Sequence, residues 1–193
     1  MTRRDNRGSA TPLLDWGEQL RAGKHKRRIL GRRVAVAGIG VTLLGLTMAF
    51  PPAPRLVWNA SASAPIGLYA VSGRQDIASG DMVLVRVPDR WRRLAAERRY
   101  IPINIPLVKR VAAAPGDRVC ARGREIYVNG HPVAERREAD GRDRPMPWWN
   151  GCVMLRSGAL FLLMDSPDSF DGRYFGPTSR GDVIGEARLL WLG

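Results

Sequence analysis

The stretch that decides the fold most clearly is PLVKRVAAAPGD, residues 106–117. Its apolar residues predict a strand, and Pro115-Gly116 ends that strand with a turn. One residue does not suit a buried strand, since Lys109 stands between Val108 and Val111. Burial disfavours the charged form of lysine and lowers its pKa. Lys109 is therefore either a candidate general base or a strand-edge side chain whose amine reaches solvent.

Short apolar runs separated by turn residues recur along the chain after residue 80. We predict strands at residues 82–87, 108–113, 125–128, 131–133 and 160–164, and a pair of strands between 183 and 190. Asn129-Gly130 predicts a tight hairpin turn. The charged segment 89–99 is compatible with a helix, and the proline-bounded segment 134–147 with a solvated loop. This pattern predicts a mainly β domain, built as a small barrel or sandwich-like sheet.

The N-terminal part of the chain combines a basic arm with an apolar run. Residues 1–33 hold 10 Lys or Arg and three Asp or Glu, so they carry seven of the 13 net positive charges, and residues 34–50 carry no charge. A basic arm can bind nucleic acid, but before an apolar run it indicates the cytoplasmic flank of a membrane span. The run is short for a span, and the segment 51–54 extends its reach. A cleaved signal peptide is the alternative.

This pattern predicts a single-pass protein of the inner (cytoplasmic) membrane. Residues 1–33 are expected to form a cytoplasmic arm, 34–50 the transmembrane anchor, and 51–193 a periplasmic domain. The two cysteines, Cys120 and Cys152, both lie in the exported part. An oxidising compartment favours a disulfide between them, and two free thiols are the alternative.

A second stretch, NASASAPIGLY at residues 59–69, places Ser63 in a turn-forming setting before a proline. A neutral lysine amine can take the proton of a serine hydroxyl, so a serine–lysine pair can act as nucleophile and base. The two histidines, His25 and His131, stand in no convincing site. Lysine is therefore the expected base of a serine enzyme. Taken alone, the Ser63 motif favours an ordinary turn serine before a proline.

Three motifs in order resemble those of type I signal peptidases. They are the Ser-x-Pro at residues 63–65, the Lys-Arg-Val-x-x-x-Pro-Gly-Asp at 109–117, and DSFDGRYFGP at 168–177. The spaced motif of residues 59–69 is similar to the TraF-type branch, the conjugative-transfer peptidases that process pilin precursors. The resemblance covers residues 56–191. It implies a mainly β, signal-peptidase-like domain behind one N-terminal transmembrane helix.

The resemblance also implies a role for individual residues. Ser63 matches the nucleophile and Lys109 the general base, while Arg110 could not replace Lys109 because guanidinium stays protonated. Ser61 matches the side-chain donor that joins the Ser63 backbone N–H in the oxyanion hole. Ser169 matches the serine that orients the lysine.

Two further residues of the last motif match the family's supporting shell. Asp171 is the acidic residue of that shell, and Arg173 is expected to pair with an acidic neighbour. Asp165 and Asp168 are weaker candidates for the same shell. The departures from leader peptidases, Ala64 after the nucleophile and Gly172 in place of a common serine, favour the conjugative branch.

The implied function is a membrane-anchored serine endopeptidase that processes exported precursors through an acyl-enzyme, most specifically in pilin maturation, with or without cyclisation. Small residues are expected at the cleavage site, because the family's pockets are shallow. The expected partners are a pilin or other exported precursor, the membrane and the conjugative apparatus. We expect no cofactor, metal or nucleic acid. The alternatives are a general signal peptidase, a non-enzymatic scaffold domain of a secretion apparatus, and a self-cleaving cytosolic repressor.

Overall fold

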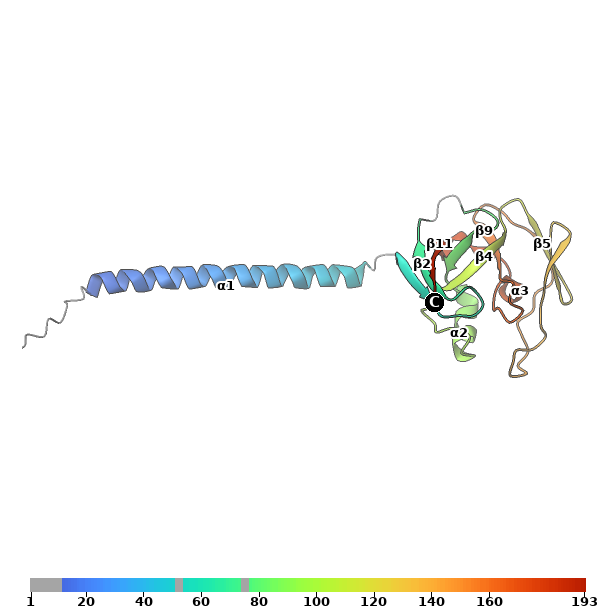
Figure 1. Cartoon of the computed structure of the whole chain (residues 1–193), viewed down its shortest axis with the longest axis horizontal. Coiled ribbons are helices and arrows are strands. Elements are labelled where there is room, and N and C mark those ends of the chain that lie inside the picture. The colour runs from blue at the N-terminus through green and yellow to red at the C-terminus, as the bar shows by residue number, and fades with distance from the viewer. Residues whose placement is uncertain (1–11, 51–53, 74–76) are drawn as a thin grey trace, which may run out of the picture. The chain divides into compact units, whose positions relative to one another are not determined.

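The computed structural model describes residues 12–50, 54–73 and 77–193, with side chains in the first range described from residue 27. The chain divides into two compact units, Met1–Pro52 and Ala53–Gly193. Figure 1 shows a long helix in the first unit and a β domain with short helices in the second. Residues 1–11 of the predicted arm and 51–53 of the segment after the anchor lie outside the described residues.

Helix α1 runs from Pro12 to Ala49 without a break at the predicted boundary between arm and anchor. Its segment Arg27–Ala49, 23 residues with a mean hydropathy of 1.6, is long and apolar enough to cross a membrane. The described side chains of this helix are exposed. Exposed apolar side chains over this length are compatible with a single-pass membrane anchor. The orientation of the anchor stays a prediction.

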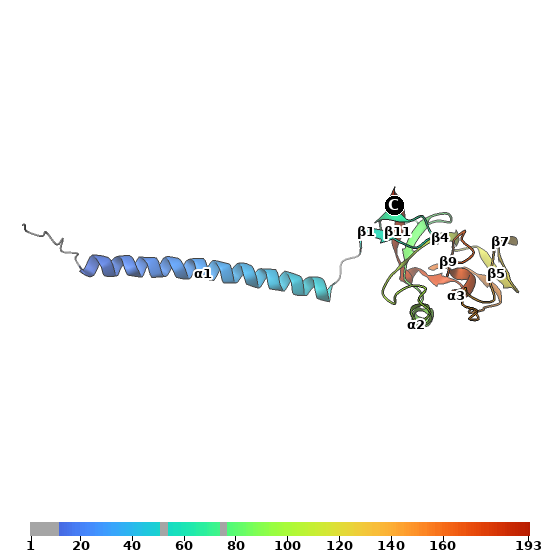
Figure 2. The same ribbon diagram turned by 60° about the horizontal axis from the view of Figure 1, so that its bottom comes forward.

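The second unit contains two antiparallel sheets among its described residues. The larger sheet has the strand order β1-β2-β11-β3-β4-β9-β10 and the smaller one the order β7-β6-β5-β8. Figures 1 and 2 place β5 of the smaller sheet far from β2 and β11. The strands are β1 Leu56–Asn59, β2 Gly67–Val71, β3 Met82–Val85, β4 Leu107–Ala113, β5 Arg118–Arg122, β6 Glu125–Val128, β7 His131–Glu135, β8 Gly151–Met154, β9 Ala159–Leu163, β10 Thr178–Ser179 and β11 Val183–Leu192.

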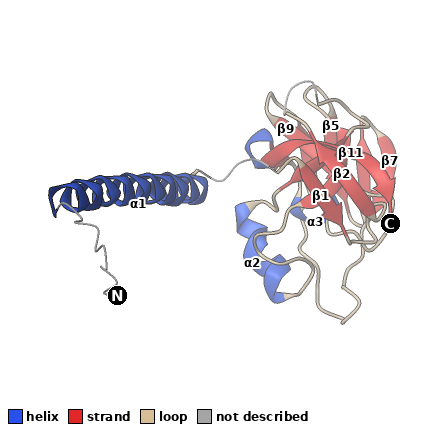
Figure 3. Ribbon diagram, turned by 60° about the vertical axis from the view of Figure 1, so that its left-hand side comes forward, coloured by secondary structure: helices blue, strands red, loops and turns tan. Residues whose placement is uncertain are grey.

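Among the described residues of the second unit, two short α-helices accompany the sheets. Helix α2 spans Asp89–Glu97 and helix α3 spans Gly172–Phe175, and a 3₁₀ turn at Arg180–Asp182 precedes β11. Side chains of α2 and α3 share one apolar cluster that includes Ala95, Phe170 and Phe175. Figure 3 shows both helices beside the sheet. The helix predicted in segment 89–99 is thereby confirmed.

The packing uses both faces of the larger sheet. Successive residues of β3 enter different clusters, since Val83 and Val85 pack with Val111 while Leu84 packs with Val108. Strands buried on both faces read as continuous apolar runs. This explains why β3, β4 and β9 were visible in the sequence. The mainly β fold class is confirmed, and the sheet order ends at β1 and β10 within the described residues.

Two sequence predictions for the C-terminal half are wrong. The pair of strands expected between 183 and 190 is one strand, β11, which pairs first with β3 and then with β2. The segment 134–147 is not simply a solvated loop, because Arg136 in it is fully buried. Its guanidinium donates to the carbonyls of Gly123 and Trp149, so burial leaves its N–H groups paired.

The two cysteines face each other across β5 and β8. Cys120 is the register partner of Cys152, and the two residues form a disulfide. The bond joins adjacent strands of the smaller sheet, so it ties β8 to β5 without reaching the larger sheet.

Candidate active site

Ser61 and Ser63 lie on the loop between β1 and β2, and Asn59 holds this loop in place. Asn59 ends β1, and its Nδ2 donates to the carbonyls of Ser61 (3.0 Å), Ala64 (3.2 Å) and Pro65 (3.0 Å). Its Oδ1 accepts the backbone N–H of Ser61 at 3.1 Å. The buried amide of Asn59 thus holds the loop that carries Ser61 and Ser63, the serine loop, against the end of β1.

Two other residues of the same motif fix the exit of the loop. The Tyr69 hydroxyl donates to the Pro65 carbonyl at 2.8 Å. A Cβ on Gly67 would collide with the backbone carbonyl oxygen of Trp191, so the close pairing of β2 with β11 requires glycine here. The sequence pointed to these residues only through their spacing, and their structural roles were missed.

We expect Asn59→Ala to lower the free energy of unfolding of the β domain by about 1–3 kcal/mol, because it leaves buried carbonyls without a donor. Urea denaturation followed by circular dichroism measures the change. Asn104→Ala, in the exposed loop before β4, is the matched control and is expected to change little. Equal effects of the two substitutions would contradict the role of Asn59.

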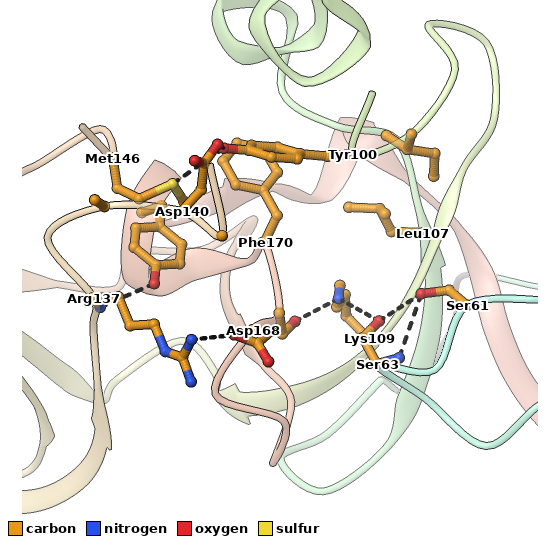
Figure 4. Close-up of a pocket in the computed structure, with 15 residues that line it drawn as sticks. Ser61, Ser63, Tyr100, Leu107, Lys109, Arg137, Asp140, Met146, Asp168 and Phe170 are labelled. Atoms are coloured by element: carbon orange, nitrogen blue, oxygen red, sulfur yellow. Dashed lines mark hydrogen bonds and ion pairs between the residues drawn. The ribbon is translucent and has the colours of Figure 1, made fainter. Parts of the chain in front are cut away.

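Lys109 lies at the centre of the candidate site. It sits on β4 opposite Val83 of β3 and is only 1% exposed. Its Nζ donates to Ser63 Oγ at 3.1 Å and to Ser169 Oγ at 2.6 Å. The Oγ atoms of Ser61 and Ser63 are 3.0 Å apart, and the Ser63 N–H donates to Ser61 Oγ at 3.4 Å. Figure 4 shows this chain of contacts from Lys109 to Ser61.

Burial changes the protonation of Lys109. Desolvation lowers the pKa of Lys109 to about 8, the negative charge of Asp171 opposes this change, and the positive charge of Arg173 adds to it. About half of the amine is therefore neutral at pH 8, and about a tenth at pH 7. A neutral amine beside a serine hydroxyl can accept the hydroxyl proton.

Asp171 and Arg173 form a buried ion pair beneath the site. Arg173 Nε donates to Asp171 Oδ1 at 2.9 Å, and both side chains are almost fully buried. Asp171 also accepts the backbone N–H of Met164 at 3.0 Å, and the guanidinium donates to the Met164 carbonyl. Between them, a Cβ on Gly172 would lie 2.7 Å from the Leu162 carbonyl oxygen, so the segment packs closely on β9.

The two weaker candidates for this supporting shell have other partners. Asp165 pairs with both terminal nitrogens of Arg110, at 2.8 and 3.0 Å. Asp168 pairs with Arg137 at 2.7 Å. Both carboxylates are largely exposed. Neither aspartate therefore belongs to the buried Asp171–Arg173 pair.

A pocket of about 490 Å³ opens beside the serine–lysine group. Ser61, Ser63, Lys109 and Ser169 contribute to its wall, together with apolar side chains that include Leu107 and Phe170. No group of three or more His, Cys, Asp or Glu side chains is placed to hold a metal ion in residues 12–50, 54–73 and 77–193.

Part of the pocket wall comes from the segment that was predicted to be a solvated loop. Arg137, Asp140 and Met146 line the pocket, together with Tyr100 from the segment between α2 and β4. The Tyr100 hydroxyl donates to Asp140 at 2.5 Å, and Arg144 also pairs with Asp140. These bonds hold the pKa of Asp140 well below its usual range. Figure 4 shows Tyr100, Asp140 and Met146 together on the side of the pocket away from Ser63.

The described residues thus bring a serine hydroxyl and a buried amine together beside a pocket on a β scaffold. The chain belongs to the signal peptidase family described as "Signal peptidase, peptidase S26", which it matches over residues 28–192. This match confirms the family resemblance found in the motifs. The chain therefore belongs to a family of serine peptidases.

The chain is also similar to named relatives and to a solved structure. The chain is 33% identical to the conjugal transfer protein TraF of Agrobacterium fabrum strain C58, covering 86% of this chain and 97% of that protein. It is 32% identical to the signal peptidase I of Bacillus caldolyticus, covering 41% of this chain and 50% of that protein. A solved signal peptidase I from Enterococcus faecalis V583 matches 62% of this chain and all of its own chain, at 21% identity and a TM-score of 0.35.

Proposed function

We propose that this protein is a membrane-anchored serine endopeptidase that processes exported precursors, with conjugative pilin maturation as its specific role. The observation that carries the proposal is the 3.1 Å contact between Lys109 Nζ and Ser63 Oγ, made by a lysine that is almost fully buried. Ser63 itself is half-buried and lines the pocket, so a polypeptide can reach it.

Acylation follows from this geometry. Neutral Lys109 accepts the proton of Ser63 Oγ while the oxygen attacks the scissile carbonyl carbon. The carbonyl oxygen becomes an oxyanion, which the Ser63 N–H and the Ser61 hydroxyl stabilise as donors. When the C–N bond breaks, the leaving amine takes the proton from Lys109. Ser169 keeps Nζ in position during both transfers.

Deacylation repeats the proton transfers with a second nucleophile. Lys109 accepts a proton from a water molecule, the water oxygen attacks the ester carbonyl, and Ser63 leaves with the proton that Lys109 returns. The product then has a free carboxylate. If the precursor's own N-terminal amine attacks instead, a peptide bond forms and the product is cyclic.

The choice of substrate rests on the relatives and on helix α1. The protein that matches almost end to end is named for conjugal transfer, whereas the signal peptidase I match covers less than half of this chain. The apolar helix is compatible with an anchor. We therefore place the β domain on the periplasmic side of the inner membrane, where a pilin precursor or another exported chain would emerge.

Incubation of the full-length protein in detergent with the pilin precursor of the same conjugation system tests the proposal. We expect a cleaved product by mass spectrometry with the wild-type protein and none with Ser63→Ala. A product lighter than the cleaved chain by one water would show cyclisation. A non-enzymatic scaffold predicts no cleavage by either protein and normal conjugation with Ser63→Ala.

Deleting the gene separates the pilin role from that of a general signal peptidase. We expect conjugation to stop while general secretion continues. A broad accumulation of unprocessed secreted proteins would instead favour the general signal peptidase.

Ser61→Ala tests the proposed oxyanion hole. We expect kcat to fall about 10²-fold with KM nearly unchanged, because the lost donor acts on charge that develops in the transition state. Steady-state kinetics on the cleaved precursor measures both constants. Ser157→Ala, in the exposed turn before β9, is the control. An unchanged kcat in Ser61→Ala would remove Ser61 from the oxyanion hole.

A further inference from the structure

A second hollow, of about 470 Å³, also reaches Ser63. Its wall includes Ala62 and Ala64, the two neighbours of Ser63 on the serine loop, and Ile66. Arg110 and Asp165 also line it. Lys109, Ser169 and the aromatic side chains of the first pocket do not take part in this wall, so Ser63 stands where two hollows of different composition meet.

An endopeptidase must bind its substrate on both sides of the bond that it breaks. The first pocket is large and partly apolar, which suits side chains that precede the scissile bond. A chain that passes Ser63 then needs a path for the residues that follow the bond. The second hollow is the path that shares Ser63 with the first pocket.

The chemistry of the second hollow suits polypeptide backbone. Arg110 and Asp165 form a bidentate pair, and their side chains are 42% and 78% exposed. The two bonds use two of the five N–H donors of the guanidinium, and each carboxylate oxygen retains a second lone pair. The pair can therefore offer a donor to a backbone carbonyl and an acceptor to a backbone N–H. The small side chains of Ala62 and Ala64 leave room for a main chain close to Ser63.

We infer that the second hollow binds the segment of the precursor that follows the scissile bond, with Arg110 and Asp165 as its specificity-determining residues. This inference rests on the proposed peptidase function. It also bears on cyclisation, because the hollow is emptied when the cleaved segment leaves. An incoming amine can then approach the acyl group on Ser63 from that side.

Two substrates test the inference with the full-length protein in detergent. One is the pilin precursor, and the other is the same precursor shortened to end one residue after the cleaved bond. We expect the wild-type protein to cleave the shortened precursor with about tenfold lower kcat/KM. We expect Arg110→Gln and Asp165→Asn each to lower kcat/KM for the full precursor to a similar degree, while leaving that for the shortened precursor unchanged.

Matched controls come from the ion pair of α2, Arg92 with Asp89, whose side chains are 30% and 85% exposed and which lines neither hollow. Arg92→Gln and Asp89→Asn should leave both substrates unaffected. Equal cleavage of both substrates by the wild-type protein, or an equal loss on both in the Arg110 and Asp165 variants, would overturn the inference. Failure of the wild-type protein to cleave the full precursor would instead overturn the proposed function.

Discussion

Replacing Lys109 with arginine is expected to lower the rate of precursor cleavage by on the order of 10³-fold, which is the contribution of a general base. Arginine keeps a positive charge and hydrogen-bond donors near Ser63, but its guanidinium stays protonated at any working pH and cannot accept the Ser63 proton. Single-turnover cleavage of the pilin precursor measures the loss. Arg188→Lys on β11, an exposed residue that lines neither hollow, is the control for a change of cation. Substantial cleavage by Lys109→Arg would exclude Lys109 as the base.

The pH dependence of the wild-type protein gives a second readout of the same residue. Since burial lowers the pKa of Lys109 to about 8, kcat/KM should rise as the pH increases through that value and level off above it. A profile that is flat between pH 6 and pH 10 would contradict a lysine base.

The same shift makes a prediction about stability. The folded-state pKa of about 8 lies below the model-compound value of 10.5, so the unfolded chain binds more protons between these two pH values. Burial of the charged Lys109 amine therefore lowers the free energy of unfolding. The whole cost is present below pH 8, and it disappears as the pH approaches 10.5. Lys109→Met removes this cost. The variant should therefore gain free energy of unfolding over the wild type, and this gain should be larger at pH 7 than at pH 10.5 by up to about 3 kcal/mol.

The residues around the serine–lysine pair could be predicted because they belong to local motifs. Ser61 and Ser63 are two residues apart, and the Ser169 motif has a recognisable spacing. The structure brings Ser61, Ser63, Lys109 and Ser169 together at hydrogen-bond distances. The sequence did not show how the loop that carries Ser61 and Ser63 is held in place. Asn59 holds it by donating to backbone carbonyls, which residues of any type could present.

The part of the pocket wall away from Ser63, which includes Tyr100 and Asp140, could not be predicted from the sequence. Tyr100 and Asp140 are 40 residues apart, and their contact depends on how segment 134–147 folds back on the domain. The charges of that segment indicated solvent, but Asp140 and Arg136 are held by specific donors and acceptors within the protein. Charge alone does not separate a solvated loop from one whose charges are paired.

Strand β11 was misread for a related reason. Its ladder shifts register between Val183 and Gly185 against β3, and again between Leu189 and Trp191 against β2. A Cβ on Gly185 would collide with the Ser72 carbonyl oxygen, so the interruption that looked like a strand end is a close approach between strands.

Removing the guanidinium of Arg173 is expected to cost about 3–5 kcal/mol of stability, because it leaves the Asp171 carboxylate buried without its partner. Asp171 is fully buried and Arg173 is 2% exposed. Arg173 also donates to the carbonyls of Met164 and Glu135, so its loss frees the loop that carries Ser169. Arg173→Ala should therefore lower the midpoint of urea unfolding strongly.

The comparison with an exposed pair makes this prediction specific. Arg137 and Asp168 pair at a similar distance, but their side chains are 52% and 70% exposed, so Arg137→Ala should cost no more than about 1 kcal/mol. The double variant Asp171→Leu with Arg173→Met should be more stable than Arg173→Ala, because it buries no unpaired charge. Equal costs for Arg173→Ala and Arg137→Ala would contradict a buried, coupled pair.

A functional readout separates this ion pair from simple packing. The positive charge of Arg173 lowers the pKa of Lys109 and the negative charge of Asp171 raises it. With Arg173 replaced by glutamine, the unopposed carboxylate should raise the pKa of Lys109, so the rise of kcat/KM with pH should move to a higher pH than in the wild type. Measuring the profile without denaturant and at low temperature keeps the variant folded. A loss of stability without any shift of the profile would mean that Arg173 holds the loop but does not set the protonation of Lys109.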